Sequence, residues 1–427
     1  MINNMFPSKY KAYFSNAGMY LSASLISSAL SVIINPFVAM NMSPEDYGIV
    51  GFYTAFNTLF TPIIGYYIID YYLRRYYQYS QQQREELKGT IIKLYLFFSG
   101  TVCLCCLGGL WFYVKIKHIE LPFFPYALLA ILQLYFAQLY NFKLAEYRIA
   151  GRGKSFFRLS VLYGLTNVIF TILFIVILKL GAFGRLFSSM LLSLTFFSIC
   201  LIKYKTYLKY RFDIKTAKDL FKYSTPLVFA GLLGFFGNGY DKVLLEQHVE
   251  LAELGIYTVG FQIAAYLDIF STSIKSTFQP DIYKALADSN YRKLIKIMLL
   301  TILFVSAIVV LFILVCPLLI RILTAGRYME SVDYVRILSL SVITSTIYYQ
   351  ISQITYGSGL SNLTFINKII GTALTILTLT ILVSKFGAYG AAWGVVLSFI
   401  IYAIGNITLL FIFKNKFLNA NSQNKPN

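Results

Sequence analysis

The sequence "KLGAFG" occupies positions 179–184 and "KFGAYG" occupies positions 385–390, so nearly the same six residues occur twice, 206 positions apart. Two further pairs keep the same order along the chain. "GRG" at 151–153 returns as "GSG" at 357–359, and "DYGIVGF" at 46–52 resembles "ELGIYTVGF" at 253–261. Three markers with one order and nearly one offset predict that one half of the chain is a duplicate of the other.

The composition is that of a membrane protein. Apolar residues make up 58% of the 427 residues and charged residues only 13%, whereas soluble domains carry about 25% charged residues. Apolar runs recur that are long enough to cross a bilayer, which takes about 20 residues as a helix. Backbone groups inside a bilayer must bond within their own segment, so each crossing is expected to be helical. We predict an all-α polytopic membrane protein with twelve transmembrane helices, near 14–40, 48–72, 90–113, 124–143, 156–179, 185–203, 224–245, 254–279, 295–317, 333–356, 365–384 and 388–413.

The distribution of the positive charges indicates the orientation. The formal net charge is +19, from 37 Lys and Arg against 18 Asp and Glu. When the loops are assigned alternately to the two sides, about three quarters of the Lys and Arg residues lie on the side of the N-terminus, which is the bias of cytoplasmic loops. We therefore predict a multi-pass membrane protein with both termini in the cytoplasm. The basic surplus reflects this topology and gives no ground for a nucleic-acid partner.

The duplication predicts the domain organisation. Six spans are an even number, so both copies enter the membrane in the same direction and form a parallel repeat. The predicted parts are an N-terminal six-helix bundle at 1–205, a cytoplasmic linker at 206–222, a C-terminal six-helix bundle at 223–413 and a cytoplasmic polar tail at 414–427. Two similar bundles facing each other would leave a central cleft that opens to either side, as in an alternating-access carrier.

Motifs for nucleotides, metals and catalysis do not fit this chain. "GRGKS" at 151–155 resembles part of a phosphate-binding loop, but that loop needs a glycine where Arg148 stands. We expect a tight cytoplasmic turn there instead, in which glycine adopts left-handed angles. The five cysteines contain no CxxC pair, and His118 and His248 have no evident acid–base partner. The chain is predicted not to be an enzyme and to bind no metal or cofactor.

Ionisable residues inside predicted spans are candidates for function, because they are costly in lipid and usually face a wet cavity or a partner. Asp268 lies near the middle of the eighth span, and Lys275 follows seven residues later on the same face. Asp268 is expected either to couple transport to an ion gradient or to pair with another helix. Asp241 and Lys242 close the seventh span in "GNGYDKVLL" and are expected to line the outer mouth of a cavity or to form a solvated helix end.

The second span ends in "YYIIDYYLRRYYQY" at 66–79. Asp70 and Arg74 are four residues apart and can pair on one helix face. Arg74 and Arg75 suit the binding of phosphate, and aromatic rings offer flat surfaces for sugars. The stretch is either the cytoplasmic entrance for an anionic, sugar-bearing substrate or an interfacial aromatic belt with snorkelling arginines. Lys143 and Arg148 at the end of the fourth span allow the same two interpretations.

Several of these stretches resemble one family of transporters. "YDKVLL" at 240–245, "LGIYTVGFQIA" at 254–264 and "KFGAYGAAWG" at 385–394 are similar to the Wzx-type O-antigen and polysaccharide repeat-unit flippases of the multidrug/oligosaccharidyl-lipid/polysaccharide exporter superfamily. The resemblance covers nearly the whole chain. The related lipid II flippases carry an arginine in the first span, whereas this chain has no charge between Tyr13 and Met42.

The resemblance implies a function. It implies a flippase that moves undecaprenyl-pyrophosphate-linked oligosaccharide, an O-antigen or capsule repeat unit, from the cytoplasmic to the periplasmic leaflet. It also implies a V-shaped cavity with a cationic lining, coupling to protons or sodium, and work alongside a polysaccharide polymerase and a chain-length regulator. Two alternatives stay open: a cation-coupled multidrug exporter of the same superfamily and a membrane glycan polymerase.

Overall fold

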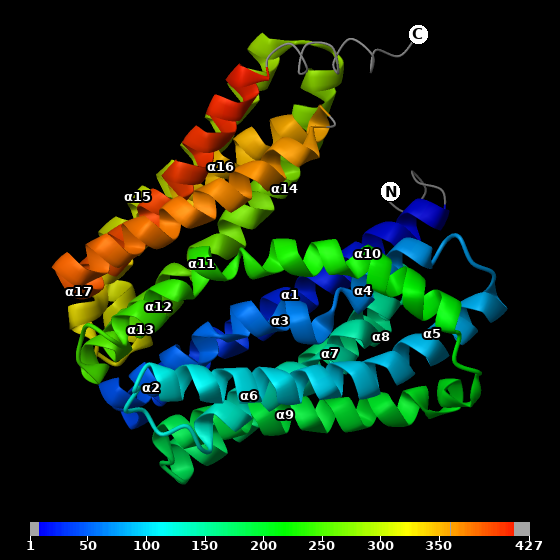
Figure 1. Cartoon of the computed structure of the whole chain (residues 1–427), viewed down its shortest axis with the longest axis horizontal. Coiled ribbons are helices and arrows are strands. Elements are labelled where there is room, and N and C mark those ends of the chain that lie inside the picture. Colours follow the sequence, from blue (N-terminus) through cyan, green and yellow to red (C-terminus); the bar gives the residue numbers. More distant parts are fainter. Residues whose placement is uncertain (1–7, 359, 414–427) are drawn as a thin grey trace, which may run out of the picture. The chain divides into compact units, whose positions relative to one another are not determined.

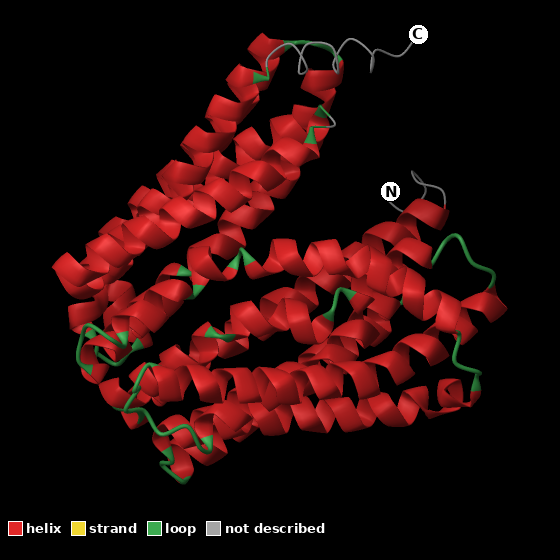
Figure 2. Ribbon diagram, viewed as in Figure 1, coloured by secondary structure: helices red, strands yellow, loops and turns green. Residues whose placement is uncertain are grey.

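The computed structural model describes residues 8–358 and 360–413, and every regular element in that part is a helix (Figure 2). The chain divides into two compact units, of which unit 1 ends at Leu232 and unit 2 begins at Leu233. Each unit is described by itself. The predicted polar tail at 414–427 lies outside the described residues.

Unit 1 is a bundle in which α7 packs along α9 and α1 packs along α8. A π-helical turn, Tyr95–Ser99, joins α5 to α6, and a second one, Ile172–Ile177, extends α8. The α-helices are α1 (Ser8–Asn41), α2 (Pro44–Ala55), α3 (Asn57–Gly65), α4 (Ile68–Arg75), α5 (Gln81–Leu94), α6 (Gly100–Ile116), α7 (Tyr126–Ile149), α8 (Gly153–Thr171), α9 (Gly181–Tyr204) and α10 (Ile214–Leu232) (Figure 1).

Unit 2 is built around α16, which packs along α17 and against α14 and α15. Helix α17 spans two predicted spans and is broken at Gly387, whose φ of 54° and ψ of −132° are not helical. The α-helices are α11 (Phe235–Asn238), α12 (Tyr240–Leu245), α13 (Leu251–Ala264), α14 (Tyr266–Ala287), α15 (Tyr291–Leu323), α16 (Val332–Gly357) and α17 (Ser361–Ile412) (Figure 1).

The helices agree with a protein that crosses a membrane several times. Nine stretches of the described residues are long and apolar enough to span, and one of them, Asn362–Ile412, contains the last two predicted spans. The fourth and tenth predicted spans coincide with α7 and α16, which are not among these nine stretches. Both helices carry buried polar side chains, such as Glu146 and Gln350, and are therefore less apolar than those stretches. The chain is an all-helical multi-span membrane protein, and the number of twelve spans stays a prediction.

The repeated sequence motifs meet each other in both units. In unit 1 the Asp46 carboxylate accepts a hydrogen bond from the Ala182 N–H, 2.8 Å away, at the start of α9. Gly181 has a φ of 53°, and a Cβ there would lie 2.5 Å from Asp46 Oδ1. In unit 2 Gly387 has a φ of 54°, and a Cβ there would lie 3.8 Å from Glu253 Oε1. The same acidic motif therefore faces the same left-handed glycine twice, which supports the predicted duplication.

Two predicted spans are interrupted in the structure. The second span, 48–72, consists of α2, α3 and α4. Phe56 separates α2 from α3, and Tyr66 and Tyr67, with left-handed φ values of 44° and 50°, separate α3 from α4. The seventh, 224–245, consists of α10, α11 and α12, which are separated near Gly234 and Gly239. A residue with a positive φ interrupts a helix because it leaves the helical region, and Gly239, with a φ of −154° and a ψ of −26°, also lies outside that region.

The predicted linker at 206–222 is largely ordered. It contains most of a 3₁₀ turn, Lys205–Lys209, and the first half of α10, which packs against α3, α4 and α5 of unit 1. The Asp213 carboxylate accepts hydrogen bonds from the Lys215 N–H, the Thr216 N–H and the Thr216 hydroxyl. These bonds, with the Thr216 hydroxyl first, hold the pKa of Asp213 below its usual value. The predicted limits 1–205 and 223–413 stay predictions.

Candidate functional site

The end of α4 carries the two arginines that were predicted for a substrate entrance. The pairing of Asp70 with Arg74 that their spacing allowed does not occur, because no ion pair of the described residues joins them. Both side chains are exposed. The Arg74 guanidinium instead lies 4.9 Å from the ring centroid of Tyr223 on α10. Arg75 Nη2 lies 4.0 Å from Asp219 Oδ2 on the same helix. Neighbouring α10 supplies partners that the α4 sequence alone does not contain.

A buried ionic cluster joins α5, α7 and α9 in unit 1. Glu146 Oε1 lies 2.7 Å from Lys88 Nζ. Glu146 Oε2 accepts hydrogen bonds from Lys143 Nζ at 2.7 Å and from the Tyr204 hydroxyl at 2.8 Å. The two ammonium groups also lie close to aromatic rings, with Lys143 Nζ 4.5 Å from the Tyr204 centroid and Lys88 Nζ 4.8 Å from the Tyr207 centroid.

This cluster places one carboxylate between two lysines, so it carries a net positive charge. Lys143 is 8% exposed, and its predicted contact with a substrate requires the cluster to open. The sequence indicated Lys143 at the end of the fourth span but gave no signal for Lys88 or Tyr204. Tyr204 is 58 residues from Glu146, and only packing brings the two helices together.

The predicted "GRGKS" turn lies between α7 and α8 and contains further cations. Gly151 has a φ of 66°, which confirms the left-handed turn, and the Gly153 N–H donates to Asn16 Oδ1 at 3.1 Å. Arg148, just before the turn, is exposed, and its guanidinium lies 5.4 Å from the Phe156 ring centroid. After the turn, α8 begins and carries Lys154.

A groove lies between α1 and α8 on this part of unit 1. Its volume is about 390 Å³, and its walls are mostly apolar. The sequence did not indicate this groove, although the spacing of four residues between Lys154 and Arg158 was a signal for one charged helix face. The lining residues are Gly18, Met19, Ser22, Lys154, Phe157 and Arg158.

In unit 2, Asp241 and Lys242 form a buried pair. Asp241 is 1% and Lys242 6% exposed, so the expectation of a solvated helix end is wrong. Asp241 Oδ2 accepts a hydrogen bond from the Tyr257 hydroxyl at 2.6 Å and lies 3.4 Å from Lys242 Nζ. The ammonium group lies 3.3 Å from the ring centroid of Phe261. Helix α13 covers the pair because Tyr257 and Phe261, one turn apart, face α12.

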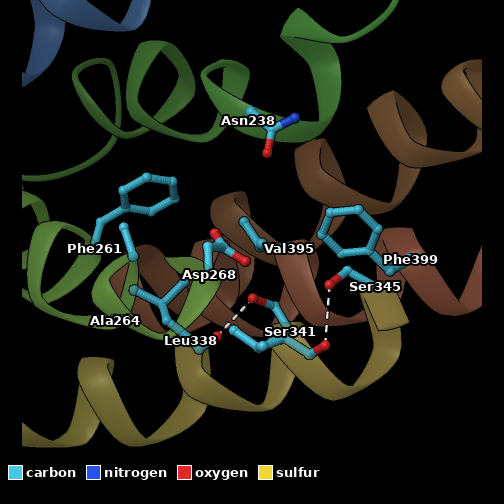
Figure 3. Close-up of a pocket in the computed structure, with 11 residues that line it drawn as sticks. Asn238, Phe261, Ala264, Asp268, Leu338, Ser341, Ser345, Val395 and Phe399 are labelled. Carbon is cyan, nitrogen blue, oxygen red and sulfur yellow. Dashed lines mark hydrogen bonds between the residues drawn. The ribbon is translucent and has the colours of Figure 1, made fainter. Parts of the chain in front are cut away.

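Asp268 lines a small pocket of unit 2, between α11, α13, α14, α16 and α17 (Figure 3). Ser341 and Ser345 lie on the α16 wall, where their hydroxyls donate to the carbonyls of Leu338 and Val342 at 2.6 and 3.0 Å. The pocket holds about 50 Å³, which suits several waters or an ion rather than a sugar.

Asp268 and Lys275 are on one helix but do not form an ion pair within the described residues. Lys275 Nζ lies 5.5 Å from the Tyr349 ring centroid instead. Asp268 is exposed, and its carboxylate has no hydrogen-bond donor among the described residues. Asp268 was predicted either to couple transport to an ion gradient or to pair with another helix, and no partner for such a pair lies among the described residues. In the same part, no group of three or more His, Cys, Asp or Glu residues is arranged to hold a metal ion.

Comparison with known sequences identifies a family. The family model described as "Polysaccharide biosynthesis protein" matches residues 14–285. An uncharacterized membrane protein of Haemophilus influenzae is 23% identical over 287 residues, covering 65% of this chain and 67% of the relative. The capsular polysaccharide biosynthesis protein CapF of Staphylococcus aureus is 26% identical over 157 residues, covering 35% of this chain and 40% of CapF.

Comparison with solved structures identifies the fold. The lipid II flippase MurJ in an inward closed conformation has a TM-score of 0.68 at 16% identity, covering 95% of this chain and 90% of MurJ. An inward-facing multidrug resistance MATE family transporter of the MOP superfamily has a TM-score of 0.66 at 16% identity, covering 95% of this chain and 99% of that protein. The resemblance found in the sequence is thereby confirmed. The chain belongs to the polysaccharide biosynthesis protein family and is a multi-span membrane protein with the MATE- and MurJ-like fold.

Proposed function

We propose that this protein is a flippase that moves undecaprenyl-pyrophosphate-linked oligosaccharide from the cytoplasmic to the periplasmic leaflet of the bacterial inner membrane. The observation that carries the proposal is that a member of the polysaccharide biosynthesis family has the fold of a lipid flippase. The partial match to a capsular polysaccharide protein supports an O-antigen or capsule repeat unit as the cargo.

The proposal includes a direction and a mechanism. The excess of Lys and Arg on one side supports cytoplasmic termini, so the basic ends of α4 and α8 meet the substrate where it is made. The two repeated units open alternately toward the cytoplasm and the periplasm. A polysaccharide polymerase and its chain-length regulator then use the delivered units on the outer side.

Deletion of the gene in its host tests this function. The expected result is loss of surface polysaccharide and accumulation of lipid-linked repeat units on the cytoplasmic face, restored by the gene on a plasmid. Normal surface polysaccharide together with altered drug sensitivity would instead support a multidrug exporter. Repeat units that reach the outer face but are not joined would support a polymerase.

The arginines at the end of α4 give a sharper test. Arg74→Ala and Arg75→Ala are expected to reduce delivery of repeat units at low expression while the protein still inserts, because each removes a cation suited to a diphosphate. Arg336→Ala is the matched control, since Arg336 is also an exposed arginine next to an aspartate, 3.3 Å from Asp333. Unchanged surface polysaccharide in both α4 variants would exclude these two residues from the substrate path.

Asp268 is the proposed coupling group. Its carboxylate lines a pocket that suits an ion or a proton and water but not a glycan. In proteoliposomes with an imposed proton or sodium gradient, Asp268→Asn is expected to abolish the stimulation of transport by the gradient. Asp288→Asn, at the exposed end of the same helix, is the control. If the gradient stimulates transport by Asp268→Asn as fully as by the wild type, coupling through this residue is contradicted.

A further inference from the structure

The groove between α1 and α8 combines two kinds of surface. Gly18 and Met19 on α1 and Phe157 on α8 give it an apolar floor. Lys154 and Arg158 also line it, one helical turn apart on the same face of α8. Its volume of about 390 Å³ falls in the range of small-molecule sites, roughly 300–1,000 Å³.

The two cations of the groove have no acidic partner. Both are exposed, and the ion pairs of the described residues involve neither. The facing helix cannot supply a carboxylate, because the first acidic residue of the whole chain is Glu45, beyond the end of α1. Two like charges one turn apart repel each other, so an anion bound between them would be stabilised by both.

The ligand must match both surfaces at once. A free sugar leaves the cations unpaired, and inorganic phosphate leaves the apolar floor uncovered. In a polyprenyl diphosphate the charged group is attached directly to a branched hydrocarbon chain, so both kinds of surface find their complement within a few bonds. We propose that the α1–α8 groove binds the diphosphate and the first isoprene units of the lipid carrier, with Lys154 and Arg158 on the phosphates and Met19 and Phe157 on the hydrocarbon.

This inference rests on the proposed function and adds a location for the substrate that no predicted residue gave. It differs from the α4 entrance, where Arg74 and Arg75 already have Tyr223 and Asp219 as partners. The cations of the groove are free to bind an anion without breaking a contact within the described part of the chain.

Binding of farnesyl diphosphate to the purified full-length protein in nanodiscs tests the charges. The double variant Lys154→Gln/Arg158→Gln is expected to bind roughly 30-fold more weakly, about fivefold for each cation. The matched control is Lys205→Gln/Lys209→Gln, which also removes two exposed lysines four residues apart in unit 1. An equal loss in both double variants would overturn the inference, because the attraction would then be a general property of a basic surface.

A second variant tests the apolar floor while the charges stay. Gly18→Leu places a side chain in the groove, and it is expected to fold, because a Cβ at Gly18 meets no atom within 4 Å. Farnesyl diphosphate should then bind about tenfold or more weakly, because the leucine occupies the apolar contact surface. The control is Gly109→Leu on α6, where a Cβ also meets no atom within 4 Å. Unchanged binding in Gly18→Leu would contradict the groove as the site of the hydrocarbon.

Competition identifies the chemistry of the ligand. Undecaprenyl phosphate should displace farnesyl diphosphate, whereas inorganic pyrophosphate, farnesol and phosphatidylglycerol should do so poorly. Equal displacement by phosphatidylglycerol would overturn the inference in favour of a general lipid site. If the Lys154→Gln/Arg158→Gln variant restores surface polysaccharide to a deletion strain at the wild-type rate, the groove is not on the route, while the flippase function itself stands.

Discussion

Glu146→Gln is expected to destabilise unit 1 strongly. It keeps the shape of the side chain and removes the negative charge that Lys88 and Lys143 share, each at 2.7 Å. Removing one partner of a buried ion pair costs about 3–5 kcal/mol, because the remaining charge is left uncompensated. Here two lysines lose their partner, so we expect a loss of at least about 3 kcal/mol in the free energy of unfolding.

The chain contains a matched control. Asp333 and Arg336 form an ion pair with the same spacing as Lys143 and Glu146, at 3.3 Å, but their side chains are 56% and 46% exposed. An exposed pair contributes about 0–1 kcal/mol, so Asp333→Asn should change stability little. The measurement is the fraction of monodisperse protein after heating, or denaturant unfolding in the same detergent, for wild type and both variants.

Rescue separates charge from packing. The triple variant Lys88→Met/Lys143→Met/Glu146→Met removes every charge of the cluster and keeps its volume. Replacing a buried ionic cluster by apolar side chains is often neutral or stabilising, so the triple variant should be more stable than Glu146→Gln. If Glu146→Gln loses no more stability than Asp333→Asn, the cluster is solvated in the membrane and the burial argument is refuted.

Three further outcomes are expected. Gly387→Ala should cost about 1–3 kcal/mol, because alanine is strained at a φ of 54° and a ψ of −132°, whereas Gly237→Ala, which meets no atom within 4 Å, should leave the melting temperature nearly unchanged. The lowered pKa of Asp213 means that its carboxylate stabilises the fold at pH values above the unfolded pKa of about 3.9, and this stabilisation is lost as the pH falls through the lower folded pKa. Wild type should therefore lose more stability than Asp213→Asn on acidification. Parallel curves of stability against pH for the two proteins would contradict this. Tyr257→Phe removes the hydrogen bond to buried Asp241 and should cost about 1.5–3 kcal/mol in denaturant unfolding; an unchanged midpoint would show that water replaces the hydroxyl.

Much of the architecture follows from local features of the sequence. Apolar runs of span length predict membrane helices because a bilayer imposes a minimum length and forbids unpaired backbone groups. The offset of the repeated motifs placed Gly181 and Gly387 in corresponding positions, and both adopt a φ near 54°. These features could be predicted because each depends on neighbours in sequence or on comparison of the chain with itself.

The side-chain chemistry of the two units could not be predicted in the same way. Glu146 and Ser352 are 206 positions apart and thus correspond in the repeat. Glu146 lies in an ionic cluster, whereas Ser352 accepts a hydrogen bond from the Asn406 amide at 2.9 Å. The predicted repeat therefore does not extend to the side-chain contacts between helices.

Run length and composition alone determined that this chain crosses the membrane as a series of helices, whereas the repeat and the basic loops on one side stay predictions. Only the tertiary structure decided which charges are paired: Arg75 with Asp219, Lys88 with Glu146, and Lys154 and Arg158 with no acid in the described residues. The physical reason is that an ion pair depends on distances of a few ångströms between helices. Those distances follow from the rotation and packing of whole helices, and no spacing along one helix encodes them.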